Sequence, residues 1–157
     1  MSFEHVQKYF TKNGLGERVI ELEQSSATVE MAATALGCYP KEIAKTMSFL
    51  VEDLPILIVT AGDAKVDNKK YKTQFQQKAK MIPGDLVETA IGHAPGGVCP
   101  FAIKPGVRVY LDVSLKRFEI VYPAAGSGNS AVKLSIPELE TYAQTQAWID
   151  VCKDWQE

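Results

Sequence analysis

The stretch IAKTMSFLVEDLPILIVTA, residues 43–61, contains the strongest strand signal in the sequence. Two runs within it, 43–51 and 56–61, are rich in β-branched and other apolar residues that fit a sheet. Asp53-Leu54-Pro55 lies between the runs, and Asp and Pro both favour turns. The pattern therefore predicts two paired strands joined by this turn.

Shorter patterns on both sides of this stretch predict further helices and strands. Apolar residues at helical spacing predict helices over 3–11 and 27–36, with Ser25 and Ser26 capping the second. A capping box from Ser135 to Glu138 begins a helix that continues to about residue 145. Strands are predicted over 18–22, 107–111, 118–122 and 132–134, with a polar helix over 67–80 and a turn or short helix at 83–85.

This irregular alternation of helices and strands, with several hairpin-like joins, predicts an α/β or α+β fold with a mixed sheet. It does not predict a doubly wound parallel sheet. The 157 residues contain no linker, internal repeat or low-complexity tract. We therefore expect a single domain that spans residues 1–157.

The composition argues against several classes of function. The net charge of −2 provides no global basic field to hold a nucleic acid, so an RNA contact would need a local patch. The 3 cysteines are widely spaced and form no Cys-x-x-Cys pair, which argues against a disulfide framework or a zinc site. The apolar runs fall far short of the ~20 residues of a membrane span, and the N-terminus resembles neither a signal nor a transit peptide. We expect a cytoplasmic protein that uses no metal, no other cofactor and no membrane.

Lys45 is a candidate functional residue because it lies in or beside a predicted strand, where lysine is disfavoured. One interpretation is an edge-strand lysine whose charge prevents sheets from associating. The other is a lysine at the mouth of a pocket, where it would hold an anionic or carbonyl group.

The segment TAGDAKVD, residues 60–67, joins a predicted buried strand to the polar helix. In a purely structural interpretation it is a connection with Asp67 as the helix N-cap. That interpretation explains Asp63 and Lys65 less well, so both are candidate substrate-binding residues. The segment contains neither GxxxxGK[ST] nor GxGxxG, and it supports no P-loop or dinucleotide site.

The loop AIGHAPGGVCPFAI, residues 90–103, contains three glycines and no residue with a charge except His93. A tight turn between strands needs one glycine, so a turn alone does not explain Gly96 and Gly97. Glycines leave the backbone N–H and C=O groups accessible to a ligand. His93 is interpreted as a polar wall or a solvated residue. Cys99 is a candidate nucleophile, although the sequence shows no recognisable partner for it.

Two further segments supply residues for contact with a ligand. The small-residue loop AAGSGNS contains Gly126 and Ser127 and could line the same pocket. The polar helix carries Lys69, Lys70 and Lys72, which form the best candidate patch for the phosphates of an RNA. The alternative for these lysines is an ordinary solvated helix face.

The order and spacing of three segments resemble the YbaK family of free-standing aminoacyl-tRNA deacylases. The segments are Ile43-Ala44-Lys45-Thr46 before an apolar strand, the loop Gly96-x-x-x-Pro100, and the glycine-rich loop after Ile120-Val121-Tyr122. The resemblance covers residues 26–139. The family is related to the editing domain inserted in bacterial prolyl-tRNA synthetases. The resemblance implies a mixed, largely antiparallel and partly barrel-like sheet with flanking helices.

The resemblance also implies a reaction, hydrolysis of the ester that joins a wrong amino acid to the 3′ end of a tRNA. In the family the lysine that matches Lys45 holds the terminal adenosine. Water attacks the ester, and a tRNA hydroxyl is often assigned a part in activating it, so no protein nucleophile is needed. Backbone N–H groups of the glycine loop would stabilise the negative charge of the oxyanion. A carboxylate in the loop would repel that charge, which explains why the loop has none. The resemblance assigns this role to the glycine loop, which comprises Gly96, Gly97, Val98, Cys99 and Pro100.

The resemblance leaves the amino acid open. Alanine-specific relatives carry Lys-Asn, where this chain has Lys45-Thr46, and Ala124-Ala125 replaces a histidine or serine of some relatives. The expected partners are the 3′ acceptor end of an aminoacyl-tRNA and an aminoacyl-tRNA synthetase. Pocket walls expected to select the amino acid by its size are Thr28, Met31, Met47 and Val98, and Thr46 is a further candidate substrate-binding residue.

Two other functions compete with an editing enzyme. A non-catalytic module of the same fold would bind a tRNA or a synthetase without turnover. A small-molecule hydrolase with Cys99 as its nucleophile would have a reactive thiol with a perturbed pKa.

Overall fold

The hairpin predicted from residues 43–61 is the centre of the fold. In the computed structural model, β2 (Ile43–Val51) and β3 (Leu54–Ala61) pair antiparallel along their length. The turn consists of Glu52 and Asp53, both with positive φ, so its predicted position was wrong by one to two residues. Positive φ at both central residues defines a type I′ turn, whose twist matches that of the two strands.

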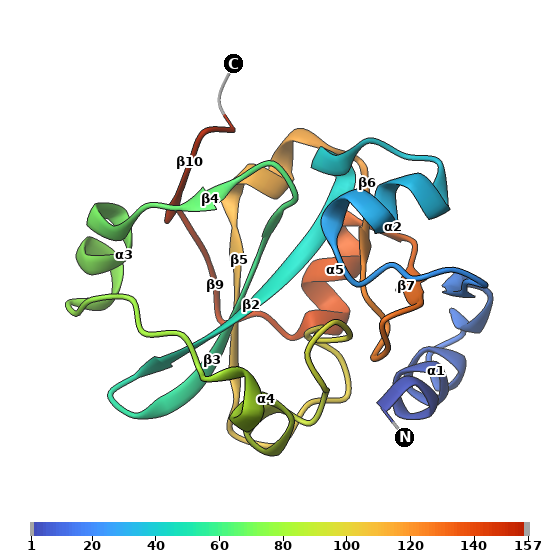
Figure 1. Ribbon diagram of the computed structural model, residues 1–157, viewed down its shortest axis with the longest axis horizontal. Coiled ribbons are helices and arrows are strands. Elements are labelled where there is room, and N and C mark those ends of the chain that lie inside the picture. The colour runs from blue at the N-terminus through green and yellow to red at the C-terminus, as the bar shows by residue number, and fades with distance from the viewer. Residues whose placement is uncertain (1, 156–157) are drawn as a thin grey trace.

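The structure describes residues 2–155, and helices surround a curled sheet (Figure 1). The helices are α1 (Ser2–Lys12), α2 (Val29–Leu36), α3 (Asn68–Phe75), α4 (Gly84–Ile91) and α5 (Ile136–Ala143), with a 3-10 helix η3 (Val113–Arg117). The other strands are β1 (Val19–Glu21), β4 (Lys65–Val66), β5 (Arg108–Asp112), β6 (Ile120–Pro123), β7 (Ser130–Val132), β8 (Leu134–Ser135), β9 (Ala147–Ile149) and β10 (Cys152–Lys153). None of the helices within this range has the length and apolar character that a membrane crossing requires.

The main sheet has the strand order β8-β6-β2-β3-β5-β9 and curls into a half-barrel. β2–β3 and β6–β8 pair antiparallel, whereas β2–β6, β3–β5 and β5–β9 pair parallel. Two smaller antiparallel pairs, β1–β7 and β4–β10, lie beside it. The predicted α+β class with a mixed, partly barrel-like sheet is therefore confirmed.

The ends of two predicted helices differ from the structure. The N-cap of α2 is Thr28, whose hydroxyl accepts a hydrogen bond from the Met31 N–H at 3.1 Å, so the cap predicted at Ser25 and Ser26 was wrong. The helix α3 has the predicted N-cap, Asp67, but it ends at Phe75 because Gln76 adopts the left-handed conformation. A single strand predicted at 132–134 is divided between β7 and β8.

The core lies between the curled sheet and the helices that cover it. α1 contributes Val6 and Phe10, both fully buried. The ring of Phe10 meets that of Phe101 edge to face, with the ring centroids 4.8 Å apart. Because Phe101 follows the glycine loop directly, this contact anchors the loop to the core.

Candidate functional site

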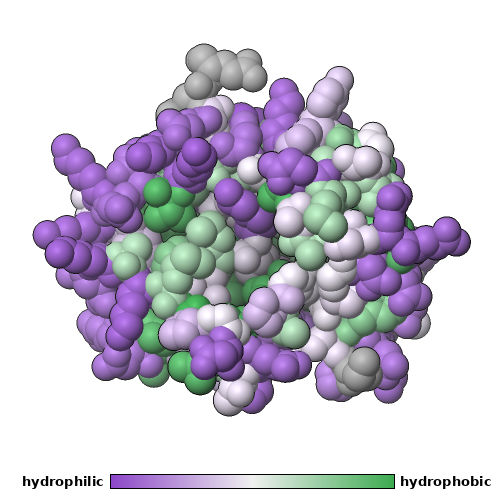
Figure 2. Space-filling view, in the orientation of Figure 1, coloured by the Kyte–Doolittle hydropathy of each residue, from purple (hydrophilic) through white to green (hydrophobic). Residues whose placement is uncertain are grey.

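A cavity of about 410 Å³ opens along one edge of β2. Its walls come from the start of α2, from β2, from residues before and in α4, from the glycine loop, and from β6 and β7 with the chain that follows β6. In Figure 2 the surface on this face is mostly apolar or weakly polar near its hollowed middle, with hydrophilic side chains around the rim. The sequence predicted six of its lining residues, namely Thr28, Lys45, Thr46, Met47, Gly96 and Val98.

The edge of β2 that faces the cavity is unpaired around Thr46. Ala44 is the last residue of β2 that pairs with β6. Further along, the Ser48 carbonyl accepts a hydrogen bond from the Ile82 N–H at 3.2 Å. Successive residues of a strand direct their N–H and C=O groups to alternate edges, so Thr46 faces the same side as Ala44 and Ser48. Its backbone polar groups are therefore directed to the cavity, and within residues 2–155 no strand pairs with them.

Lys45 alone carries a charge among the described residues that line the cavity. Its side chain is half-buried, and it forms no hydrogen bond or ion pair with another described residue. Burial lowers the pKa of this amine, while the neighbouring Cys152 and Asp63 act in the opposite direction. A cation that the protein itself does not neutralise is suited to an anionic or carbonyl group of a ligand.

The glycine loop forms another wall of the cavity, and only some of its residues line it. Gly96 and Val98 line the cavity, and their N–H groups donate no hydrogen bond within the described chain. The Gly97 N–H instead donates to the Ala94 carbonyl at 3.0 Å. Gly97 is buried against the second glycine-rich loop, where an added Cβ would lie 2.5 Å from the Ser127 nitrogen. Gly126 and Ser127 therefore support this wall from behind and do not line the cavity.

Cys99, Pro100 and His93 lie behind the same wall, and the structure does not bring them to the cavity. Cys99 and His93 are fully buried, and the Cys99 Sγ lies 3.5 Å from the His93 Nε2. The His93 Nε2 also lies 2.7 Å from the Phe101 carbonyl, so it carries the proton and donates. Burial raises the pKa of Cys99 to about 12, which keeps the thiol protonated and unreactive. This environment argues against Cys99 as a nucleophile.

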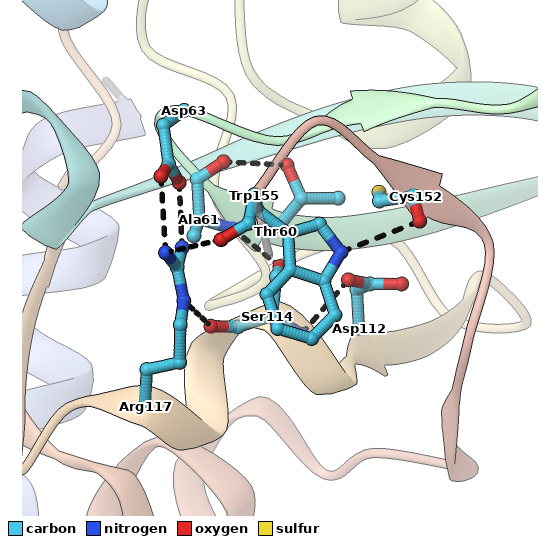
Figure 3. Close-up of polar contacts among 8 residues, drawn as sticks. All are labelled: Thr60, Ala61, Asp63, Asp112, Ser114, Arg117, Cys152 and Trp155. Atoms are coloured by element: carbon cyan, nitrogen blue, oxygen red, sulfur yellow. Dashed lines mark hydrogen bonds and ion pairs between the residues drawn. The ribbon is translucent and has the colours of Figure 1, made fainter. Parts of the chain in front are cut away.

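Asp63 belongs to an ion pair outside the cavity. Its carboxylate accepts two hydrogen bonds from the Arg117 guanidinium, at 2.6 and 3.0 Å, and Arg117 also donates to the Trp155 carbonyl (Figure 3). This contact holds Trp155 against η3. Lys65 is exposed on β4, and the structure does not bring it to the cavity either.

The three lysines of α3 differ in their surroundings. Lys69 and Lys72 are exposed, whereas Lys70 forms an ion pair with Asp150 at 3.0 Å and donates to the Cys152 carbonyl at 2.9 Å. α3 lies on the left of Figure 1, on the opposite side of the molecule from α1. Met31, on α2, is 42% exposed and does not line the cavity.

Sequence reasoning missed several residues of the cavity. Ser48 lies two positions after Thr46 on β2, and strand periodicity could have identified it as a neighbour of Thr46 on the same face. The others come from distant segments, and no local pattern distinguishes them. The missed lining residues include Ser26, Ser48, Met81, Ile82, Val87 and Tyr122.

Known proteins match both this fold and its sequence. Residues 23–142 match the family model described as an aminoacyl-tRNA editing domain. A protein of Bacillus subtilis (strain 168), called uncharacterized protein YwhH, is 50% identical over 157 residues, 99% of this chain and 100% of that protein. A proline–tRNA ligase of Bacillus licheniformis is 27% identical over 93 residues, which are 59% of this chain and 16% of the ligase.

A solved structure also matches the fold of this chain. The crystal structure of a candidate trans-editing enzyme for prolyl-tRNA synthetase superposes with a TM-score of 0.86 at 26% identity, and the match covers 97% of each chain. The family model covers most of this sequence, including β2, the glycine loop and the loop after β6. The chain therefore belongs to the aminoacyl-tRNA editing domain family.

Proposed function

We propose that this chain is a hydrolase that removes a wrongly attached amino acid from a tRNA by cleaving the ester at its 3′ end. The observation that carries the proposal is the cavity at the free edge of β2, in which Lys45 is the sole charged lining residue of the described chain. The family relationship supports the same reaction class.

The chemistry assigns separate tasks to the two walls of the cavity. On one wall, the Lys45 ammonium holds the terminal nucleotide of the tRNA. On the other, the free N–H groups of Gly96 and Val98 stabilise the oxyanion that forms when water attacks the ester carbonyl. Such a donor contributes about 3 kcal/mol of transition-state stabilisation in other hydrolases. Gly97, Cys99 and Pro100 do not reach the cavity, so they have no direct part in this chemistry.

A deacylation panel tests this proposal. The purified protein is mixed with tRNAs that carry Ala, Cys, Ser, Thr or Pro, and the remaining ester is measured over time. We expect hydrolysis of one or two of these esters and its loss in Lys45→Ala. Lys8→Ala is the matched control, because Lys8 is exposed on α1 and does not line the cavity.

Two outcomes would contradict this proposal, one the role of Lys45 and the other the deacylase activity itself. Hydrolysis that persists in Lys45→Ala would remove Lys45 from the mechanism. No hydrolysis of any ester, at low salt and high protein concentration, would instead support a non-catalytic module that binds a tRNA or a synthetase.

A further inference from the structure

Two hydroxyl groups on the cavity wall have no hydrogen-bond partner in the structure. The Thr46 Oγ1 is buried and has no hydrogen-bond partner among the described residues. Ser48 is 6% exposed as a residue, and its hydroxyl forms no side-chain hydrogen bond within residues 2–155; unlike the Thr46 Oγ1, that oxygen remains accessible. Because a buried hydroxyl without a partner is unfavourable, the Thr46 hydroxyl indicates a ligand that completes its bonding, and the accessible Ser48 hydroxyl offers that ligand a second partner.

The two hydroxyls lie on the same face of β2, since alternate residues of a strand share a face. Both residues line the cavity. Thr46 also directs its own N–H and C=O groups to this free edge, where no described strand pairs with them. The free edge thus offers a ligand both side-chain and main-chain hydrogen bonds within a short stretch of one strand.

The surfaces around these hydroxyls are apolar. Ile82 precedes α4 and Val87 lies within it, and both line the cavity. Ile82 lies next to Ser48 because its N–H donates to the Ser48 carbonyl. A group bound here would therefore meet apolar side chains next to the two hydroxyls and the free main-chain groups of Thr46. That combination suits a short side chain with a hydroxyl of its own.

We propose that Thr46 and Ser48 form the subsite for the amino-acid side chain, and that this subsite selects hydroxyl-bearing amino acids over apolar ones of the same size. This inference rests on the proposed function and names its substrate class, the seryl and threonyl esters of tRNA. An apolar isostere leaves both hydroxyls unpartnered when it binds, whereas a substrate hydroxyl pairs with them. Sites built to hydrogen-bond a substrate group reject the analogue that lacks it much more strongly than hydrophobic pockets reject a missing methylene.

Matched pairs of esters on one tRNA test the inference. Serine is compared with 2-aminobutyrate, and threonine with valine, because each pair differs by a hydroxyl in place of a methyl group. We expect the wild-type kcat/KM to favour the hydroxyl member of each pair by about tenfold or more. In Thr46→Val, which keeps the shape of the side chain, this ratio should fall towards one. Thr46→Ser should retain it, and Ser48→Ala should reduce it by a smaller factor.

A binding measurement keeps the inference separate from the proposed function. Non-hydrolysable amide analogues, seryl- and 2-aminobutyryl-3′-amino-3′-deoxyadenosine, are titrated into the same variants. Tighter binding of the seryl analogue, abolished in Thr46→Val, supports the subsite even if no ester is hydrolysed. Equal binding and equal hydrolysis of the two members of each pair would overturn the subsite and leave the deacylase intact. The thermal unfolding midpoint of each variant shows that it is folded.

Discussion

Gly97 packs directly against the backbone of Ser127: a Cβ atom at position 97 would lie 2.5 Å from the Ser127 nitrogen and 2.6 Å from the Gly126 carbonyl carbon. Backbone atoms cannot move aside as a flexible side chain can. The two glycine-rich loops are therefore held together by a contact that permits no side chain at residue 97. The absence of a side chain at Gly97 is thus explained by loop packing, independently of any approach to a substrate.

We expect Gly97→Ala to lower the free energy of unfolding by about 1–3 kcal/mol, because the added methyl group overpacks the contact between the loops. Chemical denaturation with urea measures this. Gly84→Ala is the control, since Gly84 begins α4 and an added Cβ there meets no atom within 4 Å. That change should be neutral or stabilise by up to about 1 kcal/mol. Equal stability of wild type and Gly97→Ala would mean that the loops separate more easily than the structure indicates.

Asp63 should affect stability more than catalysis, because its carboxylate is bound by Arg117 outside the cavity. We expect Asp63→Asn to lower the free energy of unfolding by about 1 kcal/mol or less, since both side chains remain partly exposed to screening solvent. The KM for an aminoacyl-tRNA should not change. Glu23→Gln, at an exposed position that forms no ion pair with another residue of the described chain, controls for the loss of one negative charge. A KM that rises in Asp63→Asn but not in Glu23→Gln would show that Asp63 contributes to substrate binding.

The charge on Lys45 should make stability depend on pH. Burial lowers the pKa of Lys45 in the folded protein below its ordinary value of 10.5. Between the folded pKa and 10.5, the unfolded chain binds more protons than the folded one, so stability rises with pH in this window. Below the pKa of Lys45 in the folded protein, the buried charge lowers the free energy of unfolding by its full amount.

Lys45→Met removes this titration, and we expect it to stabilise the protein relative to wild type at pH 7. The gain should shrink as the pH approaches 10.5, where wild-type Lys45 is neutral in the folded state. Urea denaturation of both proteins at pH 7, 9 and 10.5 measures the difference. A difference that stays constant across this range would show that the folded and unfolded pKa values are equal.

The cysteines should differ in their reaction with a thiol reagent. Cys38 is partly exposed, whereas Cys99 and Cys152 are buried and burial raises the pKa of both thiols. At pH 8 we expect Cys38 to be labelled first, and Cys99 and Cys152 to be labelled only after urea unfolds the chain. Mass spectrometry of the labelled peptides identifies each site. Cys99→Ala should retain deacylation. Rapid labelling of Cys99 with parallel loss of activity would support the nucleophile interpretation.

The exposed lysines of α3 should contribute to tRNA affinity, whereas Lys70 should contribute to stability. If Lys69 and Lys72 contact phosphates, the double variant Lys69→Ala/Lys72→Ala should bind tRNA more weakly. The slope of log affinity against log salt should fall by about 0.7–0.9 for each phosphate that is no longer neutralised. Filter binding at several salt concentrations measures this slope, with Lys8→Ala as the control on the opposite side of the molecule. An unchanged slope would identify the α3 lysines as a solvated face.

The accuracy of the sequence predictions differs between local and distant contacts. The hairpin, the Ser135 capping box and the Asp67 N-cap were predicted correctly because turn and capping preferences act over a few neighbouring residues. The turn position at Glu52 and Asp53 was missed, because a type I′ turn with residues other than Gly or Asn carries a weak local signal. The length of α3 was overestimated because polar residues continue past Phe75 in the loop that follows.

The sequence by itself therefore determined the central hairpin, the mixed fold class and the two segments on which the proposed site is built, Lys45-Thr46 and the glycine loop. Tertiary structure alone decided which of these residues reach the cavity. It placed Gly96 and Val98 at the surface of the cavity while Cys99 and His93 were buried behind it. It also paired Asp63 with Arg117, 54 residues away in the chain. Burial and ion pairing depend on segments that are distant in the sequence and come together only when the sheet curls and β2 separates from β6 beyond Ala44. No local sequence pattern specifies those long-range contacts.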